Sequence, residues 1–221
     1  MGSDMGVTTG WAISTGSKRT INSSDNLNNS KIGVSRIGSG SYVMGYVLAD
    51  QNGWLIPSSP DSPFTVVPLQ TFDKLRAAVN DGTADFFMWE HFTSKRYYDN
   101  GEIKKIGEIY TPWSSWKIVA STDIKQDDKR LEDLFWKLDN GVEYFNAHYD
   151  EAVKYISTEL DYSEEDAREW LKTVRFSTRT KGVDVAVIEK TVDALKKAGV
   201  LGEKGMKPRD MIDSQRGAQA P

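Results

Sequence analysis

The sequence predicts an α/β protein: a lobe built on a parallel-type sheet, followed by a segment that contains only helices. Two observations lead to this prediction. Up to about residue 121, short apolar segments alternate with amphipathic ones, and runs such as Phe86-Phe87-Met88 are continuous, as in strands buried on both faces. Beyond residue 122, apolar residues recur only at helical spacing.

The first part of the chain is expected to hold short strands, each bounded by turn residues. They cover residues 10–14, 31–35, 64–68, 85–89, 106–110 and 116–121. Helices are expected between several of them, at 42–50, 72–80 and 92–98. The order strand–helix–strand predicts a parallel sheet with helices on both of its faces.

The second part is expected to hold four helices. They cover residues 129–148, 151–160, a segment that opens at Ser163, and one that carries Val185 and Ile188 and stops at Gly199. Acidic residues after Ser163 and two lysines before Gly199 are typical of a helix start and a helix end. No strand remains for these apolar faces to cover. They pack on one another, or the sheet that they would cover is absent from this chain.

Composition argues against several functions. The net charge is −4 and no dense cluster of Lys and Arg occurs, so we expect no nucleic-acid partner. With no cysteine and only two histidines, neither a metal site nor a cofactor is expected. No apolar run is long enough to insert into a membrane. The N-terminus shows no signal peptide, so the expected location is the cytoplasm, or the periplasm if a signal has been removed.

A Gly/Ser turn, residues 38–41, is the clearest candidate for a binding site. It joins an apolar strand to an amphipathic helix, and glycine lets the backbone approach a ligand closely. The first N–H groups of the helix then point at an anionic or polar group, with the helix dipole in support. Arg36 could add charge. The alternative is that Ser39 or Ser41 merely caps the helix.

Other candidates lie where strands end. Trp89 and Glu90 close the fourth strand, at the edge where open α/β sheets bind ligands. Glu90 could receive an ammonium group or form a surface ion pair, and Trp89 could stack on a ligand or pack in the core. Trp113, on the loop before the sixth strand, could line a cleft. His91 is interpreted as an ordinary loop histidine.

These motifs together resemble the type 2 periplasmic binding proteins. The similarity is to the branch that binds aliphatic sulfonates, taurine, nitrate and thiamine precursors, and above all to intracellular fungal members whose ligand is unassigned. The segments that carry it are 31–41, 65–80, 82–90 and 109–116. The resemblance places ligand contacts at Ser39, Gly40, Ser41 and Tyr42. It also implies that strands of lobe one, which precede this region in family members, are missing here.

The resemblance implies a division into lobes, and the Met-Gly-Ser start and the polar C-terminal residues add the two ends. Residues 1–14 would be an N-terminal cloning scar and hinge strand, 15–121 the α/β ligand-binding lobe, 122–213 helices of an incomplete lobe one, and 214–221 a disordered tail.

The function that follows is non-catalytic binding of a small anionic or polar molecule, with lobes that close by hinge motion. One alternative is an enzyme similar to the thiamine-pyrimidine synthases, which use a Cys-rich segment that this chain lacks. Another is a truncated copy that acts as an interaction module. We expect the C-terminal helices to self-associate or to fold only loosely.

Overall fold

A computed structural model describes residues 9–55, 62–113, 117–125, 127–160, 162–177, 179–197, 200–202, 204–205 and 207–212. The chain forms two compact units. The sheet unit comprises Thr9–Pro112 and Thr191–Gly205, and the helical unit is mainly Trp113–Lys190. The expected N-terminal scar at 1–8 and the expected tail at 214–221 lie outside the described residues.

The sheet unit contains five strands in the order β3-β2-β4-β1-β5. Their bounds are β1 Gly10–Gly16, β2 Lys31–Val34, β3 Thr65–Pro68, β4 Phe86–Glu90 and β5 Ile103–Tyr110. The α/β prediction is confirmed, and β2 is parallel to both β3 and β4. β1 is the exception to the parallel direction, because it runs antiparallel to β4 and β5. Apolar periodicity is the same for either strand direction and therefore could not reveal this reversal.

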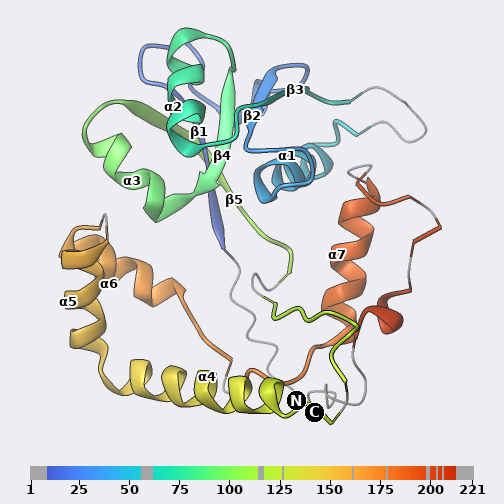
Figure 1. The fold of residues 1–221 in the computed structure, drawn as a ribbon. Helices are drawn as coiled ribbons and strands as arrows, with labels where there is room; N and C mark the ends of the chain where they lie inside the picture. Colours follow the sequence, from blue (N-terminus) through green and yellow to red (C-terminus); the bar gives the residue numbers. More distant parts are fainter. Residues whose placement is uncertain are drawn as a thin grey trace. The chain divides into compact units, whose positions relative to one another are not determined.

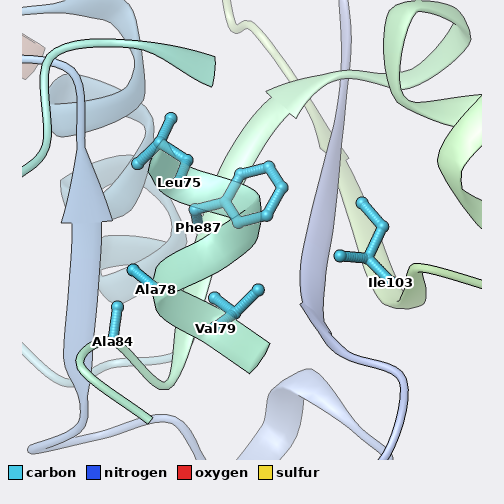
Figure 2. Packing of buried hydrophobic residues seen from close by; sticks show 6 residues of the cluster. All are labelled: Leu75, Ala78, Val79, Ala84, Phe87 and Ile103. Carbon is cyan, nitrogen blue, oxygen red and sulfur yellow. The ribbon is translucent and has the colours of Figure 1, made fainter. Parts of the chain in front are cut away.

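Helices cover both faces of this sheet (Figure 1). α1 (Gly40–Gln51) packs on the face that holds Ile32, while α2 (Phe72–Asp81) and α3 (His91–Asp99) lie on the other. Neighbouring residues of β4 divide between the faces: Phe86 packs on Phe64 with ring centroids 5.3 Å apart, and Phe87 belongs to the α2 core. Figure 2 shows that core, formed by Leu75, Ala78, Val79, Ala84, Phe87 and Ile103.

The ends of β1 and β5 are joined just beyond the sheet. The backbone N–H of Thr9 donates to Thr111 Oγ1 at 3.1 Å, and the Thr111 N–H donates to the Thr9 carbonyl at 3.2 Å. Thr111 is buried. The two strands therefore leave the sheet unit as a hydrogen-bonded pair, at the same edge at which β2, β3 and β4 end.

The helical unit contains α4 (Arg130–Ala147), α5 (Tyr149–Glu159) and α6 (Glu164–Thr173). α7 (Val185–Lys197) is divided between the units from Thr191 on. The short 3-10 helices are η1 (Ser24–Asn26) in the sheet unit and η2 (Pro208–Met211). Residues of α5 and α6 form a small core of Val153, Ile156, Ala167 and Leu171, whereas α4 has no buried residue. None of the described helices is long and apolar enough to cross a membrane.

The helices expected from the sequence are confirmed, with ends that differ by a few residues. The strand expected at 116–121 is wrong over 117–121, because these residues form no strand and are all exposed, with Val119 at 89 %. A strand needs a neighbour to accept and donate its backbone hydrogen bonds, and this segment has none among the described strands. Trp116 itself lies outside the described residues.

Candidate functional site

One edge of the sheet brings the candidate residues of the sheet unit together. β2, β3 and β4 all end at this edge, and α1, α2 and α3 begin there, so the positive ends of three helix dipoles lie along it. β1 begins at the same edge because it runs in the opposite direction. In open α/β sheets this is the edge at which ligands bind.

The Gly/Ser turn after β2 starts α1. Gly38 has φ +76°, in the left-handed region that side chains disfavour, which explains glycine at this position. Ser39 is the N-cap of α1: its backbone N–H donates to the Arg36 carbonyl at 3.1 Å, and its Oγ accepts from Tyr42 N at 3.4 Å. Ser39 therefore caps α1, and its contact with a ligand stays a prediction.

The hydroxyls of Ser39 and Ser41 form hydrogen bonds within the Gly/Ser turn and stabilise it. Ser39 and Ser41 are only 3 % and 1 % exposed, and their Oγ atoms lie 3.0 Å apart. Ser41 Oγ also accepts from the backbone N–H of Ser35 at 3.2 Å. Both hydroxyls are thus engaged inside the loop, so the groups that can face a ligand here are backbone N–H groups.

Two backbone N–H groups at the start of α1 are not used within the loop. The backbone N–H groups of Gly40 and Ser41 have no acceptor among the described residues, as expected for the first turn of a helix. Gly40 is exposed. Arg36 is exposed as well, and within the described chain it makes no ion pair. Among the described residues, no carboxylate therefore neutralises the positive charge of Arg36.

Trp11, which the sequence analysis did not single out, lies directly beside this turn. A Cβ placed on Gly40 would lie 2.8 Å from Trp11 Cη2 and 3.0 Å from Cζ2. The indole therefore packs against the Gly40 backbone, and it remains partly exposed. The available signal was indirect: glycine in the first turn of a helix indicates that another group approaches closely.

Tyr42 extends the site along α1. Its hydroxyl donates to the Tyr46 hydroxyl at 3.3 Å, and Tyr46 in turn lies 3.2 Å from Ser62 Oγ. Burial, together with the hydrogen bond and the charge of Tyr46, raises the pKa of Tyr42 to about 12. Tyr42 therefore keeps its proton at neutral pH.

Trp89 and Glu90 make structural contacts that belong to α2 and α3. The Trp89 ring stacks on Phe72 of α2, with centroids 5.0 Å apart and planes 18° apart, and so packs at the border of the α2 core. The Glu90 carboxylate caps α3, accepting from Phe92 N at 3.1 Å and from Thr93 N at 2.7 Å. Trp89 therefore lies across the sheet from α1, and ligand contact by either residue stays a prediction.

His91 belongs to a charged cluster on the α3 face. Its Nδ1 lies 3.1 Å from Glu108 Oε2 and 3.0 Å from Lys105 Nζ. Burial alone would raise the pKa of Glu108, but the hydrogen bond from Lys105 and the charges of His91 and Lys105 lower it overall.

Trp113 is half-buried and belongs to the helical unit, and its role as a ligand contact stays a prediction. Among the described residues, no group of three or more His, Cys, Asp or Glu side chains could hold a metal ion.

Comparison with known proteins agrees with this geometry. Residues 11–109 match the model of the family described as Ca3427-like PBP. The chain is 45 % identical to the Candida albicans CA3427 gene product, with a TM-score of 0.82 over 97 % of this chain and 71 % of that one. The solved structure of that relative is described as exhibiting the generic periplasmic binding protein fold. A search of curated proteins gives no match.

More distant structures share the fold. The aliphatic sulphonate binding protein SsuA of Escherichia coli is 14 % identical, with a TM-score of 0.64 over 97 % of this chain and 70 % of that one. The alkanesulfonate-binding protein SsuA of Xanthomonas axonopodis pv. citri, solved with bound MOPS, is 11 % identical, with a TM-score of 0.61 over 92 % of this chain and 72 % of that one. Fold and edge together define a protein of the periplasmic-binding-protein type. The chain belongs to the Ca3427-like PBP family.

Proposed function

We propose that the chain binds a small anionic or strongly polar molecule at the Gly/Ser turn and does not catalyse a reaction on it. The observation that carries this proposal is the pair of N–H groups on Gly40 and Ser41, which have no acceptor in the described part of the chain and lie in a loop held by buried serine hydroxyls. Ser39 caps α1, and Tyr42 follows the turn within α1. A preorganised backbone site of this kind binds an anion without reorganising, since the hydroxyls already satisfy the rest of the loop.

The named activities of the more distant relatives support the same ligand chemistry. Both SsuA proteins are described as sulfonate-binding, and a sulfonate is a compact anion with several acceptor oxygens. Helix N-termini suit such groups because N–H donors and the dipole act together. An alkanesulfonate is therefore the first ligand class to test, with phosphate and carboxylates as competitors.

A charge reversal at Arg36 tests the proposal without disturbing the buried serines. Arg36→Glu places a negative charge on the exposed side of the turn. Lys18→Glu is the matched control, because Lys18 is exposed and follows β1 at the opposite edge of the sheet. Methanesulfonate would be titrated into each protein by calorimetry at low ionic strength.

The Arg36→Glu variant is expected to bind about fivefold more weakly, since a charge near a helix terminus contributes on the order of 1 kcal/mol. The loss should shrink at high salt, where exposed charges are screened. Lys18→Glu should bind like the wild type. Equal affinities for all three proteins, or no binding of sulfonate, phosphate and carboxylate by the wild type, would remove the Gly/Ser turn from the site.

A further inference from the structure

Trp11 lies at the edge of the sheet where β2, β3 and β4 end, but it belongs to β1 and not to a helix. It sits near the start of β1, in register with Glu90 of β4 and Ile109 of β5. Its indole reaches the amino end of α1, where Cη2 and Cζ2 lie 2.8 and 3.0 Å from the position of a Gly40 Cβ. The benzene edge of the indole thus borders Gly40, whose N–H has no acceptor among the residues that the structure describes.

The absence of a side chain on Gly40 is required by this contact and not by backbone conformation. Gly40 is absent from the positive-φ glycines, and it is the first residue of a regular helix. Alanine would therefore suit the backbone at this position, and it would be a better helix former than glycine. Only the indole excludes it, because carbon atoms at 2.8 Å overlap.

The indole also has surface and a polar group that a ligand can contact. It is partly exposed, and its Nε1–H has no hydrogen-bond partner in the described part of the chain. Because the ring borders Gly40, a molecule whose anionic group accepts from the Gly40 and Ser41 N–H groups can place the rest of its body against it. An apolar body gains contact with the ring, whereas an inorganic anion has no body to place there.

We propose that Trp11 determines the specificity of the site, by favouring anions that carry an apolar carbon chain over inorganic anions of similar charge. The inference rests on the proposed function, because it assigns a ligand class to the same turn. The anionic group is held by the backbone of α1. The carbon chain lies against an indole supplied by a different strand.

A ligand series tests the proposal. Sulfate, methanesulfonate, propanesulfonate and butanesulfonate would be titrated while the amide resonances of Gly40 and Ser41 are followed by NMR. In the wild type, affinity should rise about threefold for each added CH₂ that contacts the ring. Trp11→Ala should lose this rise and keep its sulfate affinity within about twofold, and Trp11→Phe should keep part of the rise.

Trp54 offers the matched control. It is a half-buried tryptophan of the sheet unit that follows the other end of α1 and packs edge-on against Phe64 at 6.1 Å. Trp54→Ala should keep the full rise with chain length. If Trp11→Ala keeps the rise, or the wild type binds all four anions equally, the inference is wrong and the proposed function stands. If the wild type binds none of them, both are wrong.

A second measurement tests the contact without any ligand. Gly40→Ala should lower the thermal midpoint of the wild type, because the indole must move away from the new methyl group. In a Trp11→Ala background the same change should be neutral or stabilising. An equal effect in both backgrounds would show that the indole does not lie on Gly40 in solution, and the specificity proposal would fall with it.

Discussion

Replacing Ser41 with alanine removes the hydroxyl that holds the Gly/Ser turn. Ser41 Oγ accepts from the Ser35 N–H at 3.2 Å and lies 3.0 Å from Ser39 Oγ, inside a loop where Ser41 is 1 % exposed. The change leaves the Ser35 N–H without its acceptor, which costs about 1–3 kcal/mol. Alanine recovers about 0.5 kcal/mol through its higher helix propensity. The net loss of unfolding free energy should be about 1–2 kcal/mol.

Native-state hydrogen exchange of the slowest β4 amides measures this loss for the sheet unit alone, and exchange should speed up about 5- to 30-fold. Ser62→Ala is the matched control, because Ser62 Oγ also accepts from a backbone N–H, that of Phe64 at 3.3 Å, and also contacts another hydroxyl. Ser62 is exposed, so water replaces its hydroxyl and the change should stay within about 0.5 kcal/mol. Equal effects of the two variants would refute the idea that buried serine hydroxyls hold the turn.

Two further predictions concern other parts of the chain. Because the folded-state pKa of Glu108 is lowered, its ionised form stabilises the fold above the unfolded-state pKa, and this stability is lost as the pH falls through the folded-state pKa. Glu108→Gln should therefore flatten the loss of stability below about pH 5, as measured by urea unfolding at several pH values; an unchanged pH profile would contradict it. Trp136 on α4 is 63 % exposed, and we expect concentration-dependent self-association that Trp136→Gln weakens about tenfold. Sedimentation of the wild type as a monomer at all concentrations, with α4 amides as well protected as those of the sheet, would oppose this expectation.

Local sequence signals predicted the helices well. The helix starts after Ser39 and Ser163 follow from capping residues, and each of these serines accepts a backbone N–H in the structure. Such signals act over three or four residues, so they are visible in the sequence alone. The segment 117–121 shows the opposite case. Its apolar residues resemble a strand, but a strand exists only where a neighbour supplies hydrogen bonds, and no local pattern records that neighbour.

Only part of the candidate site could be predicted from the sequence, because local patterns do not show which strands are neighbours. The Gly/Ser turn is a local motif and could be located from residues 38–41. The aromatic group beside it depends on which strand pairs with which, and on the direction in which that strand runs. Trp89 was a candidate from its position at the end of a strand; it stacks on Phe72 across the sheet from α1, and its contact with a ligand stays a prediction. Trp11 reaches the turn only because β1 is antiparallel to its neighbours.

The serine hydroxyls, the backbone N–H groups and residue 11 have different roles in the proposed site, and these roles limit how ligand preference can change in this family. The hydroxyls of Ser39 and Ser41 are buried and engaged with the loop, so substitutions there alter stability before they alter recognition. The backbone N–H groups of Gly40 and Ser41 are the same whatever the side chains, and in the proposed site they hold the anionic group. On the proposal made for Trp11, residue 11 sets the preference for a carbon chain, with residue 40 constrained to glycine wherever a large ring occupies position 11. A chain with a small residue at position 11 should accept alanine at position 40 and should bind an anion without preference for its carbon chain.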